Sequence, residues 1–142
     1  MENVNIYLAG GMGNLSYDEY TRWRTQFINN VLQTKIDIIN NPVITNPTDY
    51  YNFEYQFHKT EHEIKEFELQ RIRKSDVVVV NFNDEKSIGT AMELAVAKEN
   101  RIFIVGINEN KKNIHPWLVD CVDRMCDTIE EAVDYVIQYF LN

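Results

Sequence analysis

The chain has 142 residues, which matches the usual size of one domain and leaves little room for a second. Hydrophobic residues make up 44% of it, enough for a buried core without disulfides or metal ions, which excludes a disordered chain. Lys and Arg number 14 against 22 Asp and Glu, giving a net charge of -8, so binding to a nucleic-acid polymer is not expected. We therefore treat residues 1–142 as one domain.

The N-terminus lacks the basic segment that begins a signal peptide, and no apolar run approaches the ~20 residues that span a bilayer. We expect a soluble, cytoplasmic protein with no membrane partner. The two cysteines, Cys121 and Cys126, do not have the spacing of a zinc site, and we expect them to be buried thiols. The sequence predicts no metal site and no cofactor.

Short β-branched runs alternate with longer helical patterns, which is typical of a parallel α/β sheet. The runs are almost continuously apolar, as strands covered by helices on both faces require. We predict four strands and a weaker fifth, at residues 4–9, 36–39, 77–80, 102–105 and 122–125. The expected fold is a flavodoxin-like or Rossmann-like, doubly wound sheet of five parallel strands in the order 2-1-3-4-5, with helices on both faces.

Apolar residues at helical spacing predict four helices, at residues 17–32, 64–72, 92–97 and 129–140. Three hydroxyl residues are each followed three positions later by glutamate, which is the spacing of a capping box at a helix start. These pairs are Ser16 with Glu19, Thr90 with Glu93, and Thr128 with Glu131. Residues 40–59 contain prolines and five aromatic residues, and we expect a long functional loop there.

In a sheet of this order, ligands bind beyond the carboxyl ends of the first and third strands. The first strand is followed by residues 9–14, AGGMGN, where glycines let a ligand approach the backbone. The third strand is followed by a polar segment that enters a helix carrying Glu93 in its first turn, where free amides favour anionic groups. Glu93 either completes a capping box with Thr90 or points into the pocket as a nucleophile or base, and spacing alone does not decide between these interpretations.

Five segments occur in a recognisable order and spacing: IYLAGGM at residues 6–12, WR at 23–24, NP at 46–47, SDVVVVN at 75–81 and SIGTAMELA at 87–95. From about residue 4 to residue 107, the sequence resembles the nucleoside 2-deoxyribosyltransferase family, which also includes the 2'-deoxynucleoside 5'-monophosphate N-hydrolases. The resemblance implies cleavage of the N-glycosidic bond of a 2'-deoxynucleoside. A deoxyribosyl-enzyme ester forms, and a second nucleobase or water then takes up the sugar.

The resemblance also implies roles for individual residues. Glu93 matches the family's nucleophile, whose negative charge offsets the positive charge that develops on the sugar. Tyr7 matches the tyrosine that orients this carboxylate. Glu68, eight residues before Asp76, replaces the family's aspartate and is our candidate for the acid that protonates the leaving base. We interpret Asp76 itself as closing the turn before the third strand.

The candidate substrate-binding residues are Gly10, Gly11, Met12, Asn81, Ser87, Gly89 and Thr90. The monophosphate hydrolases tend to have serine six residues before the nucleophile, where transferases often have aspartate, so Ser87 favours a phosphate. The arginine that the hydrolases place after the first strand is absent here. Arg22 or Arg24 could replace it, although an exposed helix face is the more frequent location for such residues.

The expected partners are a small deoxynucleoside or deoxynucleotide and a free nucleobase. The resemblance further implies a homo-oligomer, a dimer or larger, in which residues 115–117 reach a neighbouring subunit's pocket. We interpret Trp23 as a core or interface residue. His58 and His62 have the spacing of a metal-binding pair, but an exposed helix face explains them better because no third ligand is evident.

The leading hypothesis is therefore an enzyme that transfers deoxyribose between nucleobases. The first alternative is a 2'-deoxynucleoside 5'-monophosphate N-hydrolase. Two further alternatives are a non-catalytic nucleotide-sensing module of the same fold and a glycosidase acting on another ribosyl compound, such as an NAD-like dinucleotide.

Overall fold

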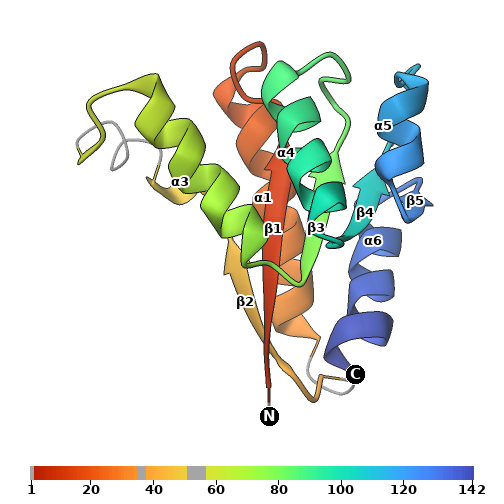
Figure 1. Cartoon of the computed structure of the whole chain (residues 1–142). Coiled ribbons are helices and arrows are strands. Elements are labelled where there is room, and N and C mark those ends of the chain that lie inside the picture. Colours follow the sequence, from red (N-terminus) through yellow and green to blue (C-terminus); the bar gives the residue numbers. More distant parts are fainter. Residues whose placement is uncertain (1, 35–37, 51–56) are drawn as a thin grey trace.

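A five-stranded sheet forms the centre of the computed structural model, which describes residues 2–34, 38–50 and 57–142. All strand pairs are parallel, and the order β2-β1-β3-β4-β5 confirms the predicted one. The strands are β1 (Asn3–Gly10), β2 (Asn41–Thr45), β3 (Val77–Asn81), β4 (Phe103–Ile107) and β5 (Arg124–Cys126). Their carboxyl ends lie together at the upper edge of the sheet in Figure 1.

Helices cover both faces of the sheet, as predicted (Figure 1). On one face lie α1 (Tyr17–Gln33) and α6 (Ile129–Val136), and on the other α3 (Glu61–Arg73), α4 (Ile88–Glu99) and α5 (Pro116–Cys121). A 3-10 turn, η1 (Pro47–Tyr50), follows β2, and a π-helical segment, η2 (Ile137–Leu141), extends α6. Neither η1 nor α5 was predicted. Because the chain leaves β1 toward one face and β3 toward the other, a crevice is expected between these two strand ends.

Each face of the sheet has its own apolar core. Ile6 and Leu8 of β1 pack with the residues of α1 and α6, whereas Tyr7 and Ala9 pack with those of α3 and α4. This alternation follows from the two-residue period of a strand. It directs the side chain of Tyr7 toward the face of the sheet that carries α4.

The predicted second strand was placed too early. Residues 36 and 37 lie outside the described residues, and Ile39 and Asn40 donate backbone hydrogen bonds to the carbonyl of Leu141 rather than to β1. The strand is instead Asn41–Thr45, within the segment expected to be a loop. Pro42 is tolerated there because β2 is an edge strand that pairs only with β1.

Two of the three predicted helix caps are present. Ser16 and Glu19 form a full capping box: Glu19 N donates to Ser16 Oγ at 3.2 Å, and Ser16 N donates to Glu19 Oε1 at 2.9 Å. Thr128 caps α6 by accepting from Glu131 N at 3.1 Å, while the Glu131 carboxylate accepts from Asp127 N instead of closing the box. The third predicted box, of Thr90 with Glu93, is wrong, because Ser87 is the residue that caps α4.

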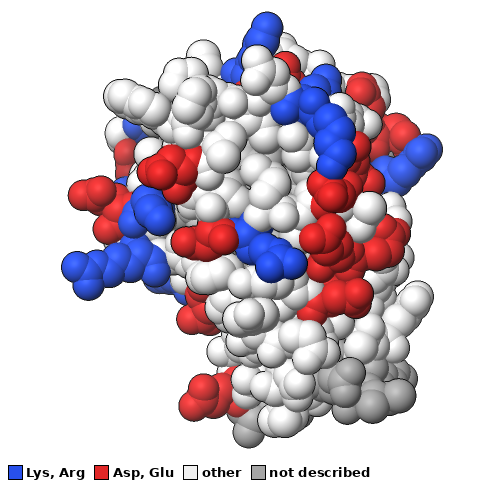
Figure 2. Space-filling view, turned by 90° about the vertical axis from the view of Figure 1, so that its right-hand side faces the viewer, with Lys and Arg blue, Asp and Glu red and all other residues white. Residues whose placement is uncertain are grey.

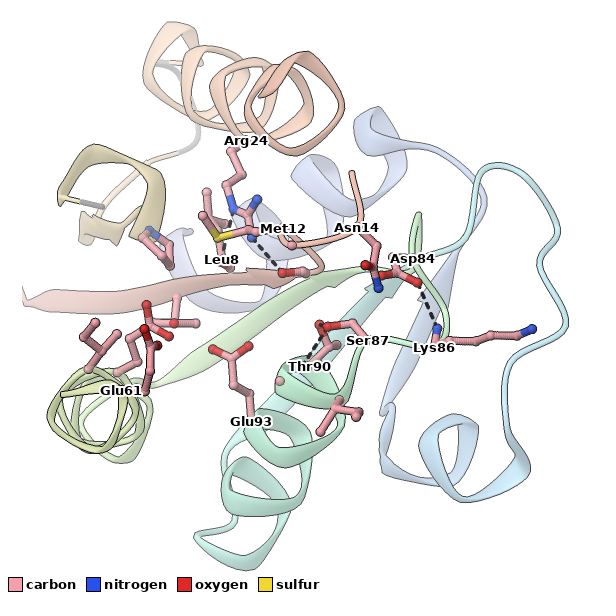
Figure 3. Close-up of a pocket in the computed structure, with 18 residues that line it drawn as sticks. Leu8, Met12, Asn14, Arg24, Glu61, Asp84, Lys86, Ser87, Thr90 and Glu93 are labelled. Carbon is pink, nitrogen blue, oxygen red and sulfur yellow. Dashed lines mark hydrogen bonds between the residues drawn. The ribbon is translucent and has the colours of Figure 1, made fainter. Parts of the chain in front are cut away.

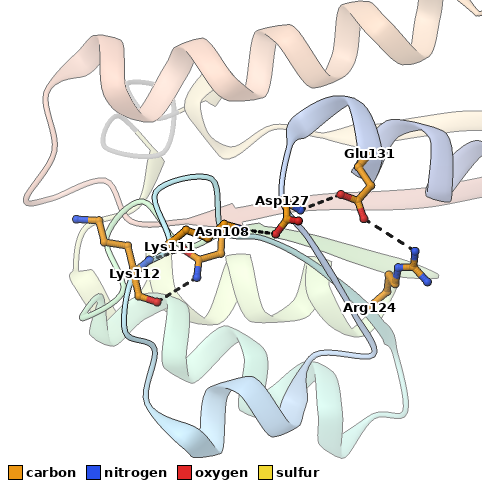
Figure 4. Close-up of polar contacts among 6 residues, drawn as sticks. All are labelled: Asn108, Lys111, Lys112, Arg124, Asp127 and Glu131. Atoms are coloured by element: carbon orange, nitrogen blue, oxygen red, sulfur yellow. Dashed lines mark hydrogen bonds and ion pairs between the residues drawn. The ribbon is translucent and has the colours of Figure 1, made fainter.

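Polar contacts fix the loop after β4 against the end of β5 (Figure 4). The side chain of Asn108 closes a turn with Lys112, donating to its carbonyl at 3.0 Å and accepting from its backbone N at 2.9 Å. Lys111 pairs with Asp127, and Arg124 lies 3.9 Å from Glu131. The charged side chains Lys111, Asp127, Arg124 and Glu131 thus contact one another at this end of the sheet.

Three expectations from the sequence concern the molecule as a whole. Cys126 is buried as predicted, whereas Cys121 is only half-buried; both are free thiols. Among the helices of the described residues, none combines the length and apolar character needed to cross a bilayer. Within the same residues, no three His, Cys, Asp or Glu side chains are grouped so that they could hold a metal ion.

Candidate active site

A cavity of about 460 Å³ lies at the carboxyl ends of β1 and β3, where the sheet order places the crevice (Figure 3). Its wall includes the turn after β1, the loop after β3, the start of α4, one side of α3 and the middle of α1. The residues that line it are Tyr7, Leu8, Gly10, Met12, Gly13, Asn14, Arg24, Pro47, Glu61, Ile64, Glu68, Asp84, Lys86, Ser87, Ile88, Gly89, Thr90 and Glu93.

Glu93 points from α4 into this cavity (Figure 3). The helix begins at Ile88, and Ser87 is its cap: Ser87 Oγ accepts from Thr90 N at 3.2 Å and from Thr90 Oγ1 at 3.0 Å. The predicted capping box of Thr90 with Glu93 is therefore wrong, because Ser87 performs the capping three residues earlier than that box requires. Glu93 lies in the second turn of the helix rather than the first, and its carboxylate is not used to close the helix end.

Tyr7 lies beside Glu93, with only 1% of its surface exposed. Within the described residues, Tyr7 Oη has no hydrogen-bond partner of good geometry. It is nevertheless close enough to the Glu93 carboxyl for the two groups to shift each other's pKa: together with burial, Glu93 raises the pKa of Tyr7, and Tyr7 lowers that of Glu93. A buried hydroxyl next to a carboxyl can stabilise its ionised form by donating a hydrogen bond.

The pocket itself favours the neutral form of Glu93. Burial raises the pKa of Glu93 most, Tyr7 lowers it, the nearby Glu68 carboxylate raises it and Arg24 lowers it, and together these effects bring it to about 8. Positive charge that develops next to a carboxyl with such a pKa would stabilise its ionised form.

Two further carboxylates come from α3. Glu68 is half-buried and lines the cavity, as the sequence predicted for a candidate acid, and Glu61 lies two helical turns before it. Glu61 was missed, although a seven-residue spacing on one helix indicates a shared face. A smaller cavity of about 200 Å³ between α3 and α4 shares Glu61, Glu68 and Glu93 with the main one and adds the apolar side chain of Leu69. Carboxylates and apolar groups thus meet next to Glu93.

The turn after β1 packs tightly against the loop after β3. A Cβ at Gly11 would lie 2.7 Å from the Cβ of Asp84, so this contact requires glycine. Gly11 is buried and does not line the cavity, unlike Gly10 and Met12. Asn81 is also absent from the lining, because it is buried at the end of β3, where its Oδ1 accepts from Asn83 N at 3.0 Å. Gly11 and Asn81, two of the predicted substrate-binding residues, thus lie outside the lining of the cavity.

The other predicted substrate-binding residues, Ser87, Gly89 and Thr90, do line the cavity. Asn14, Pro47, Asp84 and Lys86 also line the cavity but were not among the predicted binding residues. Asn14 belongs to the glycine-rich segment after β1, and Asp84 and Lys86 belong to the polar segment between β3 and α4, so their positions after strand ends were the available signal. Asp76 lies at the opposite end of the strand, where its Oδ2 accepts from Asn5 N at 2.7 Å, consistent with a structural role.

The two arginines of α1 differ in environment. Arg22 is exposed and pairs with Asp18 at 2.8 Å, as expected for a solvated helix face. Arg24 is fully buried and lines the cavity, so the same expectation is wrong for it. Trp23 of α1 is buried in the core, as predicted. His62 is exposed on α3, whereas His58 is half-buried with its ring 5.0 Å from that of Phe67.

A separate apolar cavity of about 760 Å³ lies between α4 and α5. His115 and Trp117 line it and not the candidate active site, although the two cavities share residues 86–88. Ile88, Met92 and Trp117 are exposed there. Figure 2, which looks onto the side that carries α5 and β5, shows an uncharged area bordered by acidic and basic side chains.

Neither a family model nor a curated protein matches the sequence. A 2-deoxyribosyltransferase from Bacillus psychrosaccharolyticus aligns with a TM-score of 0.73 at 16% identity, over 93% of this chain and 92% of that one. The chain has the fold of the 2-deoxyribosyltransferases.

Two further solved structures support the same fold. A 2-deoxyribosyltransferase from Leishmania mexicana aligns with a TM-score of 0.67 at 19% identity, over 97% of this chain and 99% of that one. A CMP N-glycosidase from Clostridium botulinum aligns with a TM-score of 0.62 at 11% identity, over 96% and 99%. The fold implied by the sequence resemblance is confirmed over nearly the whole chain, beyond the residues that carried the resemblance.

Proposed function

We propose that this protein cleaves the N-glycosidic bond of 2'-deoxynucleosides through a covalent intermediate on Glu93 and transfers the deoxyribose to another nucleobase. The observation that carries the proposal is the position of Glu93: it lies beyond the capped turn of α4, points into the cavity and neighbours Tyr7. The shared fold of the two 2-deoxyribosyltransferases and the CMP N-glycosidase supports an enzyme that acts on N-glycosidic bonds.

In the first step, a Glu93 carboxylate oxygen bonds to the anomeric carbon of the sugar while the bond from that carbon to the base nitrogen breaks. The electron pair of the broken bond goes to the base, and Glu68 donates a proton to it. In the second step, a nitrogen of an incoming base attacks the same carbon, its proton passes to Glu68, and the ester bond to Glu93 breaks. Two displacements at one carbon retain its configuration.

A second candidate function is hydrolysis of a 2'-deoxynucleoside 5'-monophosphate, in which water replaces the incoming base. It is favoured by Ser87 and by the start of α4, which both line the cavity. The two activities are separated by incubating the protein with a deoxynucleoside or its monophosphate, with and without an excess of a different free base. Base exchange supports the transferase, and base release supports the hydrolase. The absence of both would favour a non-catalytic nucleotide-binding module.

The sugar specificity provides a further test. A 2'-hydroxyl would crowd the face of the sugar that meets Tyr7 and Glu93, so we expect deoxynucleosides to be used in preference to ribonucleosides. Preference for a ribosyl compound in a competition assay would instead favour the alternative glycosidase.

We expect Tyr7→Phe to lower the rate by about 10-fold or more, because it removes a hydroxyl that would stabilise the ionised Glu93, a loss of about 1.4 kcal/mol. Steady-state rates of base exchange by the two proteins check this. Tyr17, which is exposed at the start of α1, provides the matched control Tyr17→Phe. A wild-type rate in Tyr7→Phe would remove Tyr7 from the proposed mechanism.

We also infer that the protein forms a homo-oligomer. The exposed apolar side chains of Ile88, Met92 and Trp117 support this, because burying an apolar surface in an interface between subunits is energetically favourable. Light scattering of the purified protein measures the mass in solution; a monomer at all concentrations would contradict the inference.

A further inference from the structure

Arg24 occupies a position on α1 where the helical pattern places apolar residues. Trp23, Phe27 and Val31 form the buried side of this helix, and Arg24 lies among them with 0% of its surface exposed. A buried guanidinium is costly unless its N–H groups are satisfied. Its presence in place of an aliphatic side chain therefore calls for a functional explanation.

The guanidinium binds three backbone carbonyls rather than a carboxylate. Nε donates to the carbonyl of Leu8 at 3.4 Å, Nη2 donates to that of Gly10 at 3.2 Å, and Nη1 donates to that of Tyr20. Leu8 and Gly10 belong to the end of β1, which borders the cavity (Figure 3). Among the described residues, no carboxylate lies within 4.0 Å of Arg24, so no direct ion pair neutralises its charge.

The fit around Arg24 is close. A Cβ at Gly10 would lie 3.5 Å from Arg24 Nη2 and 3.2 Å from Cζ2 of Trp23. The guanidinium carbon lies 4.8 Å from the centre of the Trp23 ring, within the range of a cation–π contact. Gly10 and Trp23 thus hold the guanidinium at the back of the cavity in one position.

The charges that surround the Glu93 carboxyl come from several elements. Burial raises its pKa most, Tyr7 of β1 lowers it, Glu68 of α3 raises it, and Arg24 of α1 is the basic group that lowers it. Burial lowers the pKa of Arg24 to about 10, which leaves it positively charged at neutral pH. Among the described residues, Glu61, Asp84 and Lys86 are the other titratable groups of the cavity wall, and Figure 3 shows the side chain of Lys86 extending away from Glu93.

We infer that Arg24 is a positioning residue for Glu93: its guanidinium fixes the end of β1 behind the cavity and supplies the positive charge that favours the ionised Glu93 carboxylate. The inference rests on the proposed function for its catalytic consequence. Both tasks require a charged, planar group with several donors, which lysine matches only in charge.

Arg24→Met is the direct test, because methionine fills the apolar position without the charge and should fold. We expect kcat/KM for base release or exchange to fall by about 10-fold or more at pH 7, with the rise of activity displaced to higher pH. Arg24→Lys should keep the position of that rise at a lower rate. Arg22→Gln removes one positive charge from the exposed face of the same helix, and we expect it to match the wild type.

A second readout does not depend on turnover. Titration of the Glu93 carboxyl carbon by ¹³C NMR should give a higher midpoint in Arg24→Met than in the wild type, and an unchanged midpoint in Arg22→Gln. An unchanged midpoint in folded Arg24→Met, or in Arg24→Gln if the methionine variant does not fold, would overturn the inference. If the wild type neither releases nor exchanges a base, the proposed function fails, while the titration still decides the electrostatic role of Arg24.

Discussion

Glu93→Gln is expected to reduce turnover by ~1000-fold or more while leaving the fold and substrate binding close to wild type. Glutamine has nearly the same shape and can accept the same contacts, but its amide cannot form the ester with the anomeric carbon. Glu93→Ala should be equally inactive. Initial rates of base exchange, together with equilibrium binding of a deoxynucleoside, check both parts of the expectation.

Glu99 offers a matched control, since it is an exposed glutamate at the end of the same helix. Glu99→Gln makes the same chemical change outside the cavity and should retain the wild-type rate. Turnover that survives in Glu93→Gln would assign the chemistry to another group and remove the basis of the proposed mechanism.

The same substitution should stabilise the protein, and the gain should grow with pH. The pKa of Glu93 is raised from its ordinary value of 4.5 to about 8, so between these values the folded state holds a proton that the unfolded state has lost. Folding stability therefore falls as pH rises through this window, and the loss of stability is complete above about pH 8. Glutamine has no charge to bury, so Glu93→Gln should be more stable than wild type by up to about 5 kcal/mol at high pH.

Thermal unfolding at a series of pH values from 4 to 9 measures this effect. The difference in Tm between Glu93→Gln and wild type should be small at the acid end and reach on the order of 10 °C at the alkaline end. Glu99→Gln should show no such trend. A constant difference across the range would mean that Glu93 does not carry a raised pKa, and the electrostatic description of the site would then be wrong.

The sheet could be predicted from the sequence because its central strands carry a local signal. The four valines of Val77–Val80 are buried on both faces, and such a run indicates an interior parallel strand. The edge strand β2 was misplaced because its sequence, NPVIT, has a weaker strand pattern than the preceding IDII. Pairing with β1 and the bonds of residues 39 and 40 to Leu141 decided its position, and these are long-range contacts.

The site could be predicted in part for the same reason. Strand ends and a glycine-rich turn located the cavity, and the resemblance selected Glu93, Tyr7 and Glu68, which the fold brings to one cavity. The capping pattern at Thr90 was misleading because Ser87, three residues earlier, offered a competing hydroxyl. Arg24 shares the helical spacing of the apolar residues of α1, but the β1 carbonyl groups that satisfy its guanidinium are long-range contacts, so its burial could not be predicted.

In the proposed mechanism, Glu93 forms a covalent bond with the anomeric carbon of the sugar. Intact-mass spectrometry detects this bond in the wild-type protein when it is quenched in acid after mixing with a 2'-deoxynucleoside or its 5'-monophosphate. We expect an added mass of one deoxyribosyl group, located on the peptide that contains Glu93 and missing from Glu93→Gln. Base release or exchange with no adduct on any quench timescale, or an adduct that persists in Glu93→Gln, would contradict it.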